Sequence, residues 1–245
     1  MTGVLITGGS GLLGSSIAHR ASDQYENVIT TYLSRPIDYD GINCQKVDLT
    51  NRTNIQELAE CNADAVIHCA AMTDVDQCEL KPHKAEYYNV VMSKHVARLA
   101  AQMDARLIHI STDAVFDGRD GNYKYNDETN PVNVYGQTKL NAESAIQRIH
   151  NDSIIIRTSI YGWNEATGQS LAEWMLSRLR EGETLPAFED AYFSPIYTGD
   201  LAECLLEVID NNFNGIYHIA GRDRCSKLEF ANAIAEVFEL DADLI

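Results

Sequence analysis

The chain has 245 residues, of which 45% are hydrophobic and 22% are charged. This composition excludes a disordered chain, and the length suits one large α/β domain or one domain with a small lobe. The formal net charge of −17, from 19 basic and 36 acidic residues, argues against nucleic acid or an anionic membrane as the main partner, because both require a basic surface.

Short apolar runs alternate with longer helical patterns along the chain, which is typical of parallel βαβ units. In chain order, the sequence predicts a strand at 4–6, a helix at 13–21, strands at 28–32 and 44–47, a helix at 54–59, a strand at 65–68, a helix at 85–103, a strand at 106–110, a helix at 135–149, a strand at 154–156, a helix at 171–179, a strand at 216–219 and a helix at 227–238. We therefore expect an α/β fold around a parallel sheet.

The pattern becomes looser in the last third of the chain. We expect residues 1–160 to form the dinucleotide-binding domain and residues 161–245 to form a small substrate-binding lobe, with some segments returning to the sheet. The lobe is expected to be incomplete if related chains continue beyond residue 245. The polar segment 117–133 predicts a long surface loop, and loops of this length tend to be functional.

The cysteines and histidines do not suggest a disulfide framework or a metal site. The six cysteines are scattered, none forms CxxC, and none has close metal-ligand spacing with histidine. Without a signal peptide, this pattern predicts a cytoplasmic protein with reduced cysteines. The seven histidines form neither HxH nor HExxH, so no catalytic metal is expected. No apolar run approaches the roughly 20 residues that a membrane span needs.

A glycine-rich turn follows the first predicted strand, with Gly8, Gly11 and Gly14 in the spacing GxxGxxG. In such a turn the first glycine permits the sharp bend, the second lets the backbone approach a pyrophosphate, and the third allows close packing of helix on strand. The helix that begins here favours negative charge at its N-terminus. The segment therefore predicts a dinucleotide site.

The end of the second predicted strand bears on the choice between the two nicotinamide dinucleotides. An acidic residue there would bind the ribose 2′-hydroxyl, whereas an arginine suits a 2′-phosphate. Here Ser34 and Arg35 stand at this place, with no acidic residue until Asp38. We therefore expect NADP(H) as the preferred cofactor, with NAD(H) possible; a solvated loop arginine is the alternative.

Two further segments are candidates for the cofactor site. Asp48 and Leu49 follow the third predicted strand, where the carboxylate could position the adenine or, equally, cap the next helix. Cys69, Ala70 and Ala71 end the fourth, where small residues would let a cofactor lie across the strand tips. Ordinary close packing is the alternative explanation for the small residues.

Tyr135 and Lys139 are four residues apart, so a helix would place them on one face. A free phenol has a pKa of about 10, and a nearby ammonium group would lower it. Tyr135 could then give a proton to a carbonyl oxygen while hydride reaches the carbon, and Lys139 could bind the nicotinamide ribose. Thr112 follows the fifth predicted strand, and its hydroxyl could polarise the same carbonyl.

These residues, in this order, resemble the extended short-chain dehydrogenase/reductase family, and within it the branch of dTDP-4-dehydrorhamnose reductases. The resemblance covers nearly the whole chain. The matching stretches are residues 7–14, 70–76 with Glu79, 111–118, 131–140 and 157–159. It implies a Rossmann-type doubly wound sheet with a carboxy-terminal sugar-nucleotide lobe, and the family habit makes a homodimer plausible.

The resemblance also implies roles for particular residues. It implies Thr112, Tyr135 and Lys139 as the catalytic residues. Around the cofactor we expect Gly8, Gly11, Leu12, Leu13, Gly14, Arg35, Asp48, Leu49, Cys69, Ala70, Ala71, Tyr135 and Lys139. Near the sugar we expect Thr73, Thr112, Asp113, Tyr135 and Ile160.

The implied activity is NADPH-dependent reduction of the 4-keto group of a nucleotide-linked deoxysugar. Related sugar-nucleotide 4,6-dehydratases carry Thr-Asp-Glu where this chain has Thr112, Asp113 and Ala114, so elimination is not expected. One alternative is a sugar-nucleotide epimerase of the same fold, which keeps its nicotinamide bound through turnover. Another is a non-catalytic regulatory subunit that resembles the partner of methionine adenosyltransferase.

Overall fold

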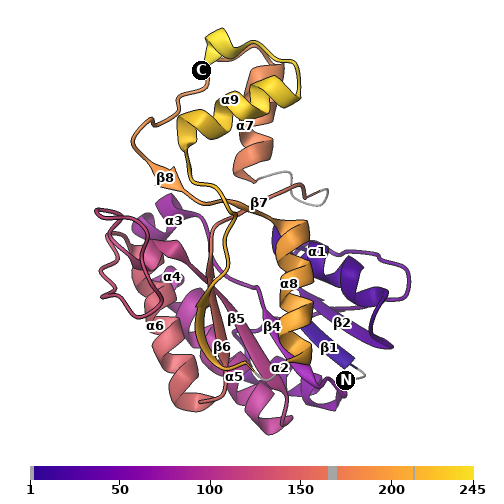
Figure 1. Cartoon of the computed structure of the whole chain (residues 1–245). Coiled ribbons are helices and arrows are strands. Elements are labelled where there is room, and N and C mark those ends of the chain that lie inside the picture. Colours follow the sequence, from indigo (N-terminus) through magenta and orange to yellow (C-terminus); the bar gives the residue numbers. More distant parts are fainter. Residues whose placement is uncertain (1–2, 165–169, 212) are drawn as a thin grey trace.

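Seven strands form one sheet in the part of the chain that a computed structural model describes, residues 3–164, 170–211 and 213–245. Their order is β10-β6-β5-β4-β1-β2-β3, and every neighbouring pair is parallel (Figure 1). The strands are β1 Gly3–Thr7, β2 Asn27–Tyr32, β3 Asn43–Lys46, β4 Ala65–His68, β5 Arg106–Thr112, β6 Ile154–Thr158 and β10 Gly215–His218. The chain order reverses between β1 and β4, and ligands bind at such a point in open parallel sheets. The predicted Rossmann-type fold is confirmed.

Helices cover both faces of the sheet because its strands are apolar on both sides. On β1, Val4 and Ile6 pack with α1 (Leu12–Ser22) and α8 (Thr198–Asp210), whereas Leu5 faces the other layer. That second layer contains α2 (Arg52–Gln56), α5 (Met92–Gln102) and α6 (Val134–Ile149). A short helix α3 (Val75–Leu80) lies between α2 and α5 in the chain. The helix predicted at 85–103 is instead α4 (Pro82–Glu86), a π-helical turn at Tyr87–Val91, and α5.

Part of the chain beyond residue 161 returns to the sheet. The helix α8, which was not predicted, packs against α1, and β10 adds to the sheet beside β6. The remaining described segments form a small lobe beyond the carboxyl ends of the strands (Figure 1). It contains α7 (Leu171–Arg180), α9 (Lys227–Val237) and the antiparallel pair β8 (Tyr192–Phe193) and β11 (Cys225–Ser226). That this lobe binds substrate stays a prediction.

The lobe has a core of its own and joins the sheet part through a short strand pair. Phe193 packs on Phe230 within a cluster that also takes in α7 and α9. Between the two parts, β7 (Ile160–Tyr161) pairs in parallel with β9 (Ile196–Tyr197). The pair stands where the chain leaves the sheet part after β6 and where it returns before α8.

Two general expectations can be compared with the described residues. All six cysteines lie in the described part of the chain and all are free. Across residues 3–164, 170–211 and 213–245, no helix combines the length and the apolar character needed to cross a membrane.

Candidate active site

A cleft of about 1000 Å³ lies at the carboxyl ends of the central strands, between the sheet and the lobe. Most of the predicted site residues line it. These are Gly8, Gly11, Leu12, Leu13, Gly14, Asp48, Leu49, Cys69, Ala70, Ala71, Thr73, Thr112, Tyr135, Lys139 and Ile160. Within the described part of the chain, Arg35 and Asp113 are not among the lining residues. The structure thus brings residues from six segments to one cavity.

The glycine-rich turn between β1 and α1 has the geometry of an anion-binding turn. Gly8 has φ +72°, a conformation that side chains disfavour, and the Gly11 N–H donates to the Gly8 carbonyl at 2.9 Å. A Cβ atom on Gly14 would lie 2.2 Å from the Gly8 carbonyl oxygen. No side chain in the described residues caps the N-terminus of α1, so its first N–H groups remain available to a phosphate.

The end of β2 reaches the cleft, but Arg35 lies beyond it. Tyr32, Leu33 and Ser34 line the cavity, and Arg35 follows on the exposed surface. A 2′-phosphate that contacted Ser34 would therefore lie beside the next residue in the chain, Arg35. The preference for NADP(H) over NAD(H) therefore stays a prediction.

Asp48 serves a local turn and does not cap the next helix. Its Oδ1 accepts hydrogen bonds from the Thr50 N–H at 3.0 Å and from the Thr50 hydroxyl at 2.6 Å. The cap of α2 is Asn51, whose Oδ1 accepts from the Thr53 N–H at 2.9 Å. The alternative role of Asp48 as a helix cap was therefore wrong, because Asn51, three residues further along the chain, occupies the cap position. Asp48 remains a lining residue of the cleft.

The small residues after β4 are explained by close packing and also line the cleft. A Cβ atom on Gly8 would lie 2.9 Å from the Ala70 Cα, so the turns after β1 and β4 nearly touch. Cys69 is buried enough that its thiol pKa rises to about 12, which keeps the sulfur protonated and unreactive. Packing and cofactor contact are thus compatible reasons for residues 69–71.

Tyr135 stands in the first turn of α6, and three contacts fix that turn. Asn133 caps the helix by accepting from the Gly136 N–H at 2.7 Å, and Glu79 on α3 accepts from the Val134 N–H at 2.6 Å. A Cβ atom on Gly136 would lie 2.2 Å from the Ala114 carbonyl oxygen. Only glycine therefore lets α6 approach the backbone after β5 this closely.

The pKa of Tyr135 is raised to about 12, the opposite of the predicted lowering. Burial of the phenol is the largest cause; a hydrogen bond with Thr112 works against it, and the negative charge of Asp113 adds to it. The charge of Lys139 does not lower this pKa. Tyr135 is thus a neutral phenol at neutral pH, in the form that can donate a proton.

Lys139 is buried, with 3% of its surface exposed. Its Nζ donates to the Ile110 carbonyl oxygen at 2.6 Å and lies 3.4 Å from Nε2 of His109. Burial lowers the Lys139 pKa to about 8, while the negative charge of Glu143 raises it. The amine is therefore mainly protonated at neutral pH, and it titrates only slightly above.

Thr112 and Asp113 form the turn after β5. The Thr112 hydroxyl accepts from the Ala114 N–H at 3.1 Å and donates to Asp113 Oδ1 at 3.2 Å. Desolvation raises the pKa of the Asp113 carboxyl, and both the Thr112 hydrogen bond and the positive charge of Lys227 oppose this rise. Lys227 is the first residue of α9, so its attraction for Asp113 acts between the lobe and the sheet.

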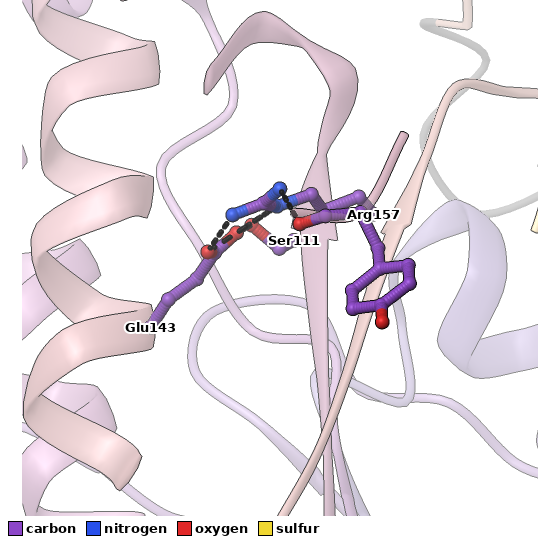
Figure 2. Close-up of polar contacts among 4 residues, drawn as sticks. Ser111, Glu143 and Arg157 are labelled. Atoms are coloured by element: carbon purple, nitrogen blue, oxygen red, sulfur yellow. Dashed lines mark hydrogen bonds and ion pairs between the residues drawn. The ribbon is translucent and has the colours of Figure 1, made fainter. Parts of the chain in front are cut away.

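A buried ion pair beside the cleft was not predicted. Glu143 on α6 and Arg157 on β6 are 2% and 4% exposed, with 2.8 Å between Oε2 and Nη2. Ser111 donates to Glu143 Oε1 at 2.5 Å, as Figure 2 shows, and Arg157 donates to the Tyr125 carbonyl at 3.2 Å. Glu143 thus ties α6 to β5 and β6, and Arg157 holds the loop 117–133. One feature of the sequence could have indicated this pair: Glu143 is a charged residue two helical turns after Tyr135 and four residues after Lys139.

The whole chain, residues 1–245, matches the family model described as RmlD substrate binding domain. The chain is 36% identical over 245 residues to the probable low-salt glycan biosynthesis reductase Agl14 of Haloferax volcanii, a match that covers 98% of this chain and 81% of that protein. It is 33% identical over 246 residues to dTDP-4-dehydrorhamnose reductase of Mycolicibacterium smegmatis, covering 99% of this chain and 71% of that protein.

A solved structure agrees with these sequence matches. The dTDP-4-dehydrorhamnose reductase of Bacillus anthracis, determined in complex with NADP, superposes with a TM-score of 0.86 at 30% identity. The match covers 98% of this chain and 82% of that chain. The likeness therefore extends over the sheet part and the lobe.

Proposed function

The chain belongs to the RmlD substrate binding domain family, among the extended short-chain dehydrogenases/reductases, and we propose that it reduces the 4-keto group of a nucleotide-linked deoxysugar with NADPH. The relatives named as reductases support a nicotinamide-dependent oxidoreductase that acts on a sugar nucleotide. The preference for NADPH and the identity of the substrate as a 4-keto deoxysugar are the finer parts of the proposal. Arg35 and the names of the relatives support these parts.

The observation that carries the proposal is the meeting of Thr112, Tyr135 and Lys139 in the same cleft as the glycine-rich turn. These groups come from β5 and α6, whereas the turn follows β1, so the sheet topology alone brings them together. A phenol, a hydroxyl and an ammonium around one cavity suit the protonation of a carbonyl oxygen.

The cleft fits a dinucleotide at its glycine-rich end. The uncapped first turn of α1 and the close approach at Gly14 leave room for a pyrophosphate. When bound, NADPH supplies the hydride that reduces the keto carbon. Gly11 and Leu12 would hold the pyrophosphate, and Lys139 would hold the nicotinamide ribose.

The residues around the carbonyl would each have one task. Tyr135 gives its phenolic proton to the carbonyl oxygen, so that hydride on carbon and a proton on oxygen together make the alcohol. Its high pKa keeps that proton in place until negative charge develops on the oxygen. Thr112 orients the same oxygen by a hydrogen bond. Ile160, at the lobe side of the cleft, contacts the sugar.

The test is NADPH oxidation with dTDP-4-keto-6-deoxy-L-mannose, run beside NADH. We expect turnover with NADPH, and we expect Tyr135→Phe to reduce kcat by about 10²–10⁴-fold while the NADPH dissociation constant changes less than about twofold. Tyr217→Phe, on the edge strand β10 away from the lining residues, is the matched control. Full activity of Tyr135→Phe would overturn the mechanism.

One substitution and two outcomes separate the finer parts of the proposal. Arg35→Ala should reduce the preference for NADPH over NADH if the arginine binds the 2′-phosphate. Turnover of the sugar without net NADPH oxidation would indicate the epimerase. Tight NADPH binding without any turnover, together with co-purification with a methionine adenosyltransferase, would indicate the regulatory subunit.

A further inference from the structure

Two buried histidines lie directly behind Lys139, and no role was predicted for either. His68 on β4 and His109 on β5 are paired in the parallel register of the sheet. Each is 1% exposed, and their ring centroids are 5.2 Å apart. Histidine is seldom so fully buried, since a ring nitrogen needs a partner there.

His68 is fully occupied by its own hydrogen bonds. Its Nε2 lies 3.0 Å from the Ser93 hydroxyl, which donates its own proton to the Asn89 carbonyl at 2.6 Å. Ser93 must therefore accept from Nε2–H, so that Nδ1 of the neutral ring accepts from the Thr7 hydroxyl at 2.7 Å. Burial and the positive charge of Lys139 lower the His68 pKa to about 3. His68 is thus a neutral ring that has no lone pair left to offer.

His109 has a different arrangement. An ammonium group has only donors, so Nε2 of His109, 3.4 Å from Lys139 Nζ, must accept. The proton of the neutral ring is then on Nδ1, and this buried nitrogen has no hydrogen-bond partner among the described residues. Burial holds the His109 pKa well below its usual value, and the charge of Lys139 lowers it further. Among the described residues, Lys139 is therefore the one hydrogen-bond partner of the ring.

The three N–H groups of Lys139 can be assigned from these contacts. One donates to the Ile110 carbonyl and one to His109, so one remains for the cleft that Lys139 lines. We propose that His109 is a positioning residue for Lys139: it accepts one ammonium N–H and so directs a single remaining N–H to a ligand in the cleft. This inference rests on the proposed function for the identity of that ligand, a nicotinamide nucleotide.

Other ionisable groups also face Lys139, and they bear on its titration. They are Glu143 on the same helix, Cys69 after β4, His68 on β4 and His109 on β5. Glu143 is the only one of these described groups that carries a charge at neutral pH, and it belongs to the ion pair with Arg157. His109 contributes an acceptor without contributing a charge.

Removing the acceptor should change how Lys139 titrates. In His109→Leu the second N–H of the buried ammonium loses its partner, so we expect the Lys139 titration midpoint to fall by about 1 pH unit. His109→Gln restores an oxygen acceptor near the place of Nε2, and its midpoint should stay within about half a pH unit of the native value. His109→Met is a second variant without a suitable acceptor, in case leucine does not fold there.

The experiment follows the Lys139 ε-methylene group by NMR through a pH titration, assigned with Lys139→Arg. NADPH affinity by fluorescence is the second measurement, and we expect it to weaken about tenfold in His109→Leu at neutral pH. His150→Leu is the matched control. Like His109, His150 has a buried Nδ1 without a partner among the described residues, but its Nε2 binds the Ala105 carbonyl at 3.0 Å, and it follows α6 at the other end of the sheet.

The outcomes separate this inference from the proposed function. An unchanged Lys139 midpoint in folded His109→Leu and His109→Met would overturn it, as would an equal shift in His150→Leu. A lowered midpoint that His109→Gln restores would support it, even if the wild-type protein oxidised no NADPH. In that case the proposed function would fail and the positioning of Lys139 would stand.

Discussion

The sheet side of the cleft and the lobe side are held in place by different means. On the sheet side, parallel ladders fix the residues at the cleft, as where Ser111 pairs with Arg157. In the lobe, β8 and β11 are two residues long, and aromatic contacts such as Phe193 on Phe230, 5.4 Å between centroids, hold the elements together. The residues with proposed chemical roles therefore sit on the side with the fixed backbone.

Two ion pairs, one on each side of the cleft, differ in the same way. Glu143 and Arg157 are almost fully buried between α6 and β6, whereas Arg178 and Glu183 in the lobe are 33% and 48% exposed at 3.0 Å. A buried pair cannot lose one partner without leaving an uncompensated charge, but an exposed pair can rely on water. We therefore expect the loss of a charge to be costly at Glu143 and mild at Glu183.

The strongest way to test this contrast is to neutralise one acid on each side. Glu143→Gln would leave the guanidinium of Arg157 buried without its counter-charge, so we expect the free energy of unfolding to fall by about 3–5 kcal/mol. For Glu183→Gln in the lobe we expect a loss below about 1 kcal/mol. Both are measured by chemical denaturation followed by circular dichroism.

Equal losses in the two variants would remove the contrast. A small loss in Glu143→Gln, under about 1 kcal/mol, would mean that water reaches Arg157. Activity adds a second readout, because Glu143 also accepts from Ser111, next to Thr112. We expect kcat to fall in Glu143→Gln by more than the unfolded fraction explains, whereas Glu183→Gln should keep its kcat.

An effect of intermediate size is expected at Lys139, whose burial costs stability. Its folded pKa of about 8 lies below the usual 10.5, so between these two values the unfolded chain binds more protons. Wild-type stability should therefore rise with pH across that window, and below about pH 8 the full cost of the buried charge is present.

Lys139→Met removes this cost together with the proposed ribose contact. We expect the variant to be inactive yet more stable than wild type by about 1–2 kcal/mol at neutral pH, or roughly 2–6 °C in Tm. The gain should shrink as the pH rises from about 8 toward 10.5. Lys46→Met, at the exposed end of β3, is the control. A gain that did not depend on pH would exclude titration of Lys139 as its cause.

The same contrast explains what the sequence could predict. Strands of the sheet part are short apolar runs between turn signals, and all seven were expected close to their observed bounds. The cleft followed from them, because the carboxyl ends of parallel strands meet at one edge. The short strands β7, β8, β9 and β11 gave no such signal in the sequence. Each is two residues long and forms where segments distant in the chain pack together.

Two misses on the sheet side have different causes. The helix α8 could have been predicted from the sequence, because Leu201, Leu205 and Ile209 have helical spacing, and all three are buried in the structure. The raised pKa of Tyr135 could not be predicted from the sequence, because it depends chiefly on how far the fold buries the phenol. A spacing of four residues predicts a shared helix face but does not predict which acceptor a long side chain selects.

The smallest expected effect tests whether the lobe opens separately from the sheet part. Ser226 caps α9 by accepting from the Glu229 N–H at 3.0 Å, and Glu229 accepts from the Ser226 N–H at 2.7 Å. Ser226→Ala removes the first of these bonds and should cost about 1 kcal/mol. Asn51→Ala removes the cap of α2 on the sheet side and should cost a similar amount.

Hydrogen exchange distinguishes where each loss appears. Because the lobe has its own core and is joined to the sheet part through β7 and β9, Ser226→Ala should speed exchange in α7 and α9 while amides of the central strands keep their protection. NADPH affinity should be unchanged, since the residues proposed to bind the dinucleotide lie on the sheet side. Faster exchange in β1 and β4 of Ser226→Ala would instead mean that both parts unfold as one unit, and the lobe would then contribute to the stability of the cofactor site.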